Sequence, residues 1–146
     1  MFRWYGYIGG AGSLGLLVLR LAYGAAFCVH GWGKIQNPTG WAGPDAPFPP
    51  YLLVAAAVAE FGGGIAMILG FLTPLFALML ACTMAVAALK VHIPHGDPFV
   101  GGYEPAVVYF AIAVCTLLVG PGQLSLDYCL FGRRRTAAGL PPYAGR

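Results

Sequence analysis

The sequence predicts an all-α integral membrane protein, a four-helix bundle of two antiparallel hairpins with both termini in the cytoplasm (N-in/C-in). Three observations predict this fold. The 146-residue chain is 59% hydrophobic and only 9% charged, whereas an average soluble domain is about 25% charged. Four apolar stretches approach or exceed the length of about 17 residues that a spanning helix needs. Lysine and arginine are unevenly divided between the two ends of this predicted bundle, which indicates orientation.

The predicted helices cover approximately residues 12–31, 51–72, 74–91 and 104–119 of a single transmembrane domain, 1–146. The first could be mistaken for a signal peptide, but Arg20 interrupts its apolar run and no clear cleavage pattern follows, so we interpret it as uncleaved. A very short turn at Thr73–Pro74 makes the second and third helices antiparallel neighbours. The last stretch is marginal unless it extends or tilts.

The basic residues predict the orientation. Arg3 precedes the first helix, and four arginines follow the last: Arg133, Arg134, Arg135 and Arg146. The opposite loops hold only Lys34 and Lys90. The arginine-rich side is therefore predicted to be cytoplasmic. Residues 120–146 form a predicted cytoplasmic tail: a turn and a short interfacial segment, then a disordered stretch whose arginines face anionic lipid. The net charge of +3 is too small and dispersed for nucleic-acid binding.

The four cysteines argue against a disulfide-forming membrane oxidoreductase. Cys28, Cys82, Cys115 and Cys129 form no CxxC motif, and the first three lie inside predicted helices. A thiol–disulfide exchange enzyme needs closely paired, accessible thiols. We interpret these cysteines as small apolar packing residues.

Two charges fall near the middle of the predicted membrane core. Arg20 lies about eleven residues, or about 16 Å, below the outer end of its helix, and Glu60 lies at a similar depth. A lone charge there costs about 3 kcal/mol or more, so the sequence predicts an Arg20–Glu60 ion pair. The pair either fixes helix register only, or lines a polar cavity where Glu60 takes or passes a proton.

A second polar group gathers near the outer face. On the first helix, the spacing predicts one shared face for Arg20, Gly24, Phe27, Gly31 and Lys34, with His30 beside it. Lys90 and His92 end the third helix, His95 follows, and Glu104 opens the fourth. Lys34 or Lys90 could pair with Glu104. The alternative is that these are interfacial side chains reaching for water.

The histidines allow two cofactor interpretations, and neither is favoured. His30 and His92 could form a bis-histidine haem site, but such pairs usually lie within helices. His92 and His95, with Asp97 nearby, could hold a metal ion at the outer surface, although their spacing is loose. No haem, flavin or metal motif is convincing, and no residue is assigned as a metal ligand.

Four segments resemble the DoxX family of small four-helix bacterial membrane proteins: LRLAYGAAFCVHGWGK at 19–34, AEFGGGIAMILGFLTP at 59–74, the KVH and GGYEP elements around 90–105, and GPGQLSLD at 120–127. The resemblance implies a bacterial inner-membrane protein linked to quinone chemistry. Some members look like anchors for soluble redox enzymes, and one branch resembles the membrane subunit of a thiosulfate:quinone oxidoreductase. Carried over by motif, Arg20, His30 and Glu60 would form a proton or quinone site, and Lys34, His92 and Glu104 would bind substrate.

We therefore predict a redox-associated membrane subunit that interacts with quinone and works with a partner oxidoreductase. No electron-carrier motif accompanies the site, so electrons would come from a larger membrane or membrane-associated complex, and whether the chain is itself an enzyme stays open. Partners besides the lipid bilayer would be such a complex or further copies of the chain. One alternative is a non-catalytic accessory or anchor subunit. Another is a small proton-coupled transporter, although four helices enclose little volume unless they oligomerise.

Overall fold

The computed structural model describes residues 7–44 and 46–132, and within them it contains helices and turns but no strand. Four long helices dominate: α1 (Gly10–Gln36), α2 (Pro50–Leu69), α3 (Thr73–Val86) and α5 (Glu104–Val119). α3 continues through a π-helical turn, η1 (Ala87–His92), into α4 (Ile93–His95). A bent segment, η2 (Phe99–Tyr103), precedes α5, and its Val100 and Gly101 are not helical. Four helical runs are long and apolar enough to cross a membrane: Gly10–Gln36, Pro50–Leu69, Thr73–His95 and Phe99–Val119. The all-α, four-helix prediction is confirmed.

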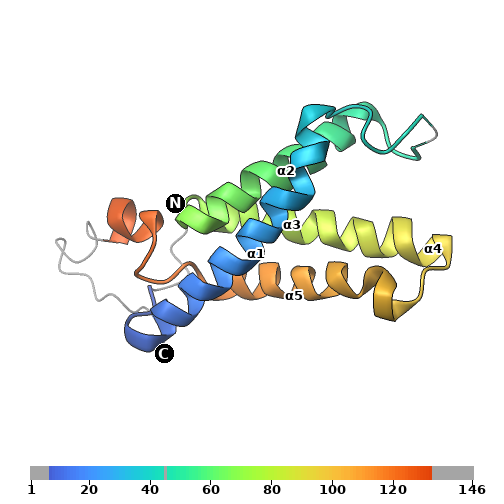
Figure 1. The fold of residues 1–146 in the computed structure, drawn as a ribbon. Coiled ribbons are helices and arrows are strands. Elements are labelled where there is room, and N and C mark those ends of the chain that lie inside the picture. The colour runs from blue at the N-terminus through green and yellow to red at the C-terminus, as the bar shows by residue number, and fades with distance from the viewer. Residues whose placement is uncertain (1–6, 45, 133–146) are drawn as a thin grey trace.

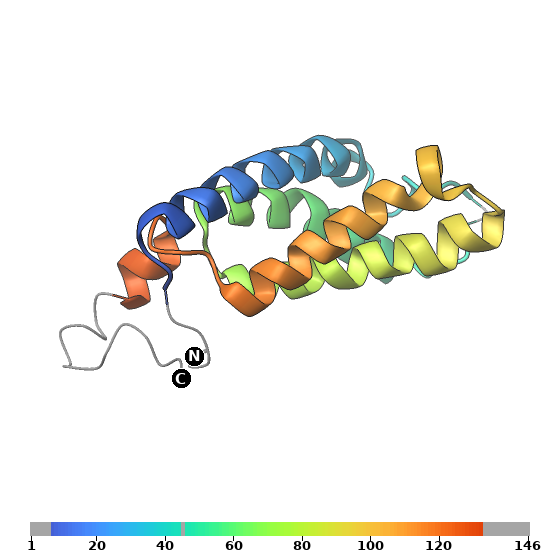
Figure 2. The same ribbon diagram turned by 90° about the horizontal axis from the view of Figure 1, so that it is seen from below.

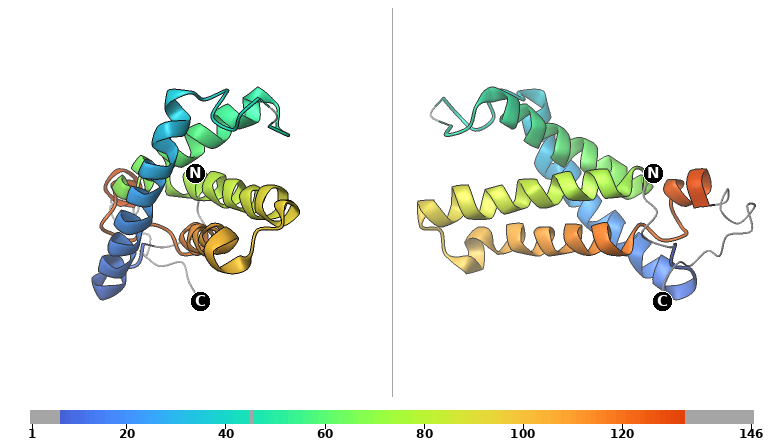
Figure 3. Two further views of the ribbon diagram at one scale, coloured as in Figure 1. Left: turned by 45° about the vertical axis from the view of Figure 1, so that its right-hand side comes forward. Right: turned by 180° about the vertical axis from the view of Figure 1, so that it is seen from behind.

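The helices form two hairpins that meet at one end and diverge at the other (Figures 1 and 3). α1 packs along α2, and α3 packs along α5. We call the end that carries the turn at residues 70–72 and the segment 120–132 the clasp end. The opposite end, with residues 37–44, 46–49 and 93–98, is the loop end. The first helix begins and the last ends at the clasp end; which side of the membrane this end faces stays a prediction, and residues 133–146 lie outside the described part of the chain.

The first hairpin is held by backbone-to-backbone contact between α1 and α2. A Cβ atom added at Gly24 would lie 2.9 Å from the Gly64 carbonyl oxygen, and one at Gly64 would lie 2.7 Å from the Gly24 oxygen. A Cβ atom at Gly31 would lie 2.5 Å from the backbone nitrogen of Phe61. Small residues allow this approach of two membrane helices. The contact also explains why α1 runs on to Gln36, five residues beyond its predicted end at 31.

Replacing Gly31 with alanine is expected to destabilise the protein by about 1–3 kcal/mol, the usual cost of overpacking. The new methyl group would meet backbone atoms of Phe61, which cannot move aside as a flexible side chain could. Gly15→Ala is the matched control, because a Cβ atom there meets open space in the same helix. Unfolding in mild detergent on addition of SDS measures both variants. Equal stability of the two would contradict the close approach.

The two hairpins meet through an aromatic and aliphatic core. Phe27 of α1 contacts Tyr109 of α5, with ring centroids 5.1 Å apart, and Tyr23 of α1 lies 5.8 Å from Phe27. Buried α2, α3 and α5 side chains complete this core: Met67, Ala77, Leu80, Ala81, Met84, Ala106 and Ala113. Aromatic side chains thus fill the space between α1 and α5.

At the clasp end, the segment after α5 folds back against the start of α1 (Figure 2). The backbone nitrogen of Gln123 donates to the Ile8 carbonyl at 3.0 Å, and that of Leu124 donates to the Ser13 hydroxyl at 2.9 Å. The Asp127 carboxylate caps α3 by accepting hydrogen bonds from the backbone nitrogens of Leu72, at 2.8 Å, and Thr73, at 2.9 Å. The predicted turn after the last helix is therefore a structural part of the bundle.

Candidate functional site

Arg20 does not pair with Glu60, so that prediction is wrong. The Arg20 side chain is fully buried, and its Nη1 atom donates to the carbonyl oxygens of Met67 at 3.0 Å and Ile68 at 3.4 Å. Its Nη2 atom donates to the Leu124 carbonyl at 2.5 Å. Glu60 precedes Met67 by seven residues, which places it about 10 Å nearer the loop end along α2.

The C-terminal end of α2 stabilises the positive charge of Arg20. The last carbonyl groups of a helix have no intrahelical partner and carry the negative end of its dipole. Arg20 donates to two carbonyls of this last turn, of which that of Met67 also accepts from the Gly70 nitrogen at 3.1 Å. It joins them to the segment that follows α5. The buried Asp127 carboxylate also acts on it electrostatically. Arg20 therefore ties three parts of the chain together; its predicted place in a proton or quinone site is not tested by these contacts.

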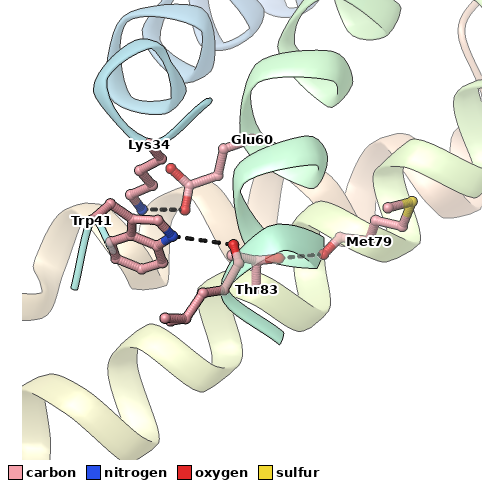
Figure 4. A network of polar contacts seen from close by, with 6 residues as sticks. Lys34, Trp41, Glu60, Met79 and Thr83 are labelled. Carbon is pink, nitrogen blue, oxygen red and sulfur yellow. Dashed lines mark hydrogen bonds and ion pairs between the residues drawn. The ribbon is translucent and has the colours of Figure 1, made fainter. Parts of the chain in front are cut away.

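Glu60 pairs instead with Lys34. The Lys34 Nζ atom lies 2.5 Å from the Glu60 Oε1 atom, and the two side chains are 25% and 2% exposed. The same ammonium lies 4.4 Å from the centre of the Trp41 ring, a cation–π contact. The Trp41 indole donates to the Leu53 carbonyl at 3.1 Å, which ties the loop after α1 to α2 (Figure 4). Because α1 extends to Gln36, Lys34 is helical and reaches across to α2.

A pocket of about 520 Å³ opens beside this ion pair, between α2 and α3. Its walls are almost entirely apolar and come from residues 52–59 of α2 and 79–87 of α3 and η1, with Phe48 and Trp41 contributed by the loop. Its charged groups are Lys34, Glu60 and Lys90. The Thr83 hydroxyl donates to the Met79 carbonyl at 2.9 Å within the wall (Figure 4). Size and lining match small-molecule sites, which are about 300–1,000 Å³, mainly apolar, with few polar groups.

Of the six residues singled out from the sequence, the pocket brings together Lys34 and Glu60. Arg20 lies at the clasp end. His30 is exposed on α1, with its ring 5.9 Å from that of Tyr109. Glu104 opens α5. Lys34 forms its ion pair with Glu60. Within residues 7–44 and 46–132, neither Glu104 nor Lys90 makes an ion pair. The predicted pairing of Lys34 or Lys90 with Glu104 is therefore wrong.

The histidines at the loop end gather around Asp97. The Nδ1 atoms of His92 and His95 lie 2.7 Å and 2.9 Å from its two carboxylate oxygens. Hydrogen bonds from His95 and then His92 hold the pKa of the Asp97 carboxyl below its ordinary value. In the part of the chain that the structure describes, no group of three or more His, Cys, Asp or Glu side chains could hold a metal ion.

Sequence reasoning missed three residues that the structure makes prominent. Asp127 caps α3 from a segment that was predicted to be a cytoplasmic tail. Trp41, in the loop after α1, contacts the Lys34 ammonium and donates a hydrogen bond to the Leu53 carbonyl of α2. Lys90 was placed in the outer polar group as a possible partner of Glu104, yet it lines the pocket. A lone acid after a membrane helix is a signal for Asp127, but nothing in the pattern indicates the pocket contact of Trp41.

Comparisons with known proteins agree with this architecture. A protein-family model for DoxX matches residues 15–93. The chain is 31% identical to inner membrane protein YqjF of Escherichia coli over 128 residues, which cover 81% of this chain and 93% of that protein. It is 28% identical to the putative oxidoreductase CatD of Bacillus subtilis over 82% of this chain and 89% of that protein. Inner membrane protein YphA of E. coli is 31% identical, with 82% and 92% covered. No solved structure matches.

Proposed function

This chain belongs to the DoxX family, and from that premise we propose that it is an inner-membrane subunit that binds a quinone and works with a partner oxidoreductase. The observation that carries the proposal is the buried Lys34–Glu60 pair at the polar end of an apolar pocket. Glu60 is only 2% exposed, and a carboxylate so far out of water is costly unless it is paired. The pair adjoins a space of small-molecule size. Intramembrane ionisable residues of this kind are by default functional.

The pocket residues fit a quinone headgroup and its apolar substituent. A quinone supplies, when bound, an acceptor for two electrons and two protons. The Lys34 ammonium has three N–H donors and uses one on Glu60, so others remain for a carbonyl oxygen. Glu60 is the carboxylate that would hold or release a proton, with Lys34 stabilising its charge. The apolar α2 and α3 walls would accept the hydrocarbon part of the ligand.

The partner supplies the electrons in this proposal. The sequence offers no convincing haem, flavin or metal motif, and one relative bears the name of a putative oxidoreductase. Two relatives are named as inner membrane proteins, which supports the same location here. The arginine distribution then predicts that the clasp end faces the cytoplasm, where soluble redox enzymes would reach it.

Filling the pocket should remove the quinone. Ala56 of α2 lines the pocket and is half-buried, so Ala56→Phe would place a ring in the cavity. Ala111→Phe on the exposed face of α5 is the matched control. The tagged full chain is extracted from native membranes in mild detergent, and bound quinone is quantified by native mass spectrometry. We expect stoichiometric quinone on the wild type and on Ala111→Phe, and at least a roughly tenfold loss on Ala56→Phe.

Two results would overturn the proposal. Equal quinone on all three proteins would assign the bound quinone to the lipid-facing surface rather than to the pocket. A stable complex with a larger enzyme, carrying no quinone on this subunit, would favour the accessory or anchor role instead.

A further inference from the structure

The charges that line the pocket do not cancel. Lys34 and Lys90 are positive and Glu60 is negative, which leaves a net charge of +1 when all three are ionised. Lys34 and Glu60 satisfy each other at 2.5 Å. Lys90 is exposed and has no ion pair with any residue of 7–44 or 46–132. The pocket therefore presents one cation whose charge the described protein groups leave unmatched.

Lys90 lies where the apolar wall ends. It belongs to η1, the π-helical turn that extends α3 toward the loop end, and its neighbours Val86, Ala87 and Val91 line the same wall. The carboxylate nearest in sequence, Asp97, is already held by two histidines on its two oxygens. The apolar part of a ligand in the pocket would thus lie along α2 and α3. The part of the ligand that emerges from the pocket would lie beside the Lys90 ammonium.

We propose that the pocket selects the anionic form of an aromatic-headed amphiphile over its neutral isostere, and that Lys90 is the residue that selects the charge. This inference rests on the proposed function, because it assigns a ligand class to the same pocket. The exposed Lys90 ammonium attracts an anionic group of a ligand that emerges from the pocket beside it. A neutral headgroup can accept a hydrogen bond from Lys90 but gains no charge attraction. The difference between the two ligands is therefore the attraction between two full charges, which water and salt weaken at an exposed site.

The test compares two probes of nearly the same shape. 2-Hydroxy-1,4-naphthoquinone is an anion at pH 7, and 2-methyl-1,4-naphthoquinone is neutral. Each is equilibrated by dialysis with the full-length protein in zwitterionic lipid nanodiscs, and empty nanodiscs correct for partition into lipid. We expect the wild type to bind the anion about two- to fivefold more tightly than the neutral probe, which is the range for one exposed charge pair. The preference should shrink as salt is added.

Variants of Lys90 separate charge from shape. Lys90→Gln should abolish the preference while affinity for the neutral probe stays within about twofold, and Lys90→Arg should keep the preference. If wild type and Lys90→Gln bind both probes equally well, the charge inference is wrong and the pocket proposal stands. If neither probe binds the wild type and filling the pocket with Ala56→Phe changes nothing, the pocket proposal itself fails. A preference for the anion that survives in Lys90→Gln would also overturn the role of Lys90.

Discussion

Replacing Arg20 with glutamine is expected to lower the free energy of unfolding by about 3–5 kcal/mol, the usual cost of breaking a buried charged network. The change removes the donors that the Met67 and Leu124 carbonyls now use, and it leaves the buried Asp127 charge without a nearby cation. Arg20→Lys should recover only part of the loss, because an ammonium lacks the planar fork that reaches carbonyls of two segments at once.

The measurement is unfolding in mild detergent, combined with hydrogen exchange of residues 120–127. Exchange there should accelerate strongly in Arg20→Gln, because this segment is attached to α1 and α2 partly through the guanidinium. Ser13→Ala is the graded control: it removes one hydrogen bond to the same segment, from the Leu124 nitrogen, and should cost about 1 kcal/mol. If Arg20→Gln is as stable as Ser13→Ala but has lost the quinone that we propose, the structural role of Arg20 is contradicted. Arg20 would then be part of the ligand site.

The contrast between predicted and observed partners of Arg20 shows what sequence reasoning lacked. The four helices could be predicted, because a bilayer requires long apolar segments whose backbone bonds are satisfied internally. The depth argument failed because it measured Arg20 from a helix end at residue 31, whereas α1 ends at Gln36. It also assumed that only a carboxylate can answer a buried guanidinium. Carbonyl groups in the last turn of a helix do so as well, and their position depends on tertiary packing.

The pocket could be predicted only in part. Lys34 and Glu60 were both singled out because charges in membrane segments are costly, and that reasoning holds for any arrangement of the helices. Their pairing follows from the close contact of α1 with α2 at Gly31, a tertiary feature. The side on which the hairpins open depends on Phe27 and Tyr109 filling the space between α1 and α5. No periodicity in the sequence indicates which of two apolar interfaces will stay open.

Replacing Lys34 and replacing Glu60 should lower the free energy of unfolding by unequal amounts, although each change breaks the same ion pair. Lys34→Met leaves the Glu60 carboxylate, only 2% exposed, without a cation, and should cost about 3–5 kcal/mol of unfolding free energy. Glu60→Gln leaves Lys34, which is 25% exposed and has a flexible stem that can turn toward water, so about 1–2 kcal/mol is expected. Detergent unfolding measures both, and equal losses would contradict the burial difference on which the asymmetry rests.

The double variant Lys34→Met/Glu60→Gln then separates structure from function. Removing both charges of a buried pair is often neutral or stabilising, so stability should return to within about 1 kcal/mol of the wild type. The coupling energy of the two changes should therefore be about 3 kcal/mol or more. If the pair only fixes helix register, recovered stability should also bring back the quinone content that we propose for the wild type. If the pair is the polar end of the ligand site, the double variant folds normally and remains without quinone, because the donor and the carboxylate are both gone. We expect the second result, since a pair kept only for packing would have no reason to adjoin a pocket of about 520 Å³.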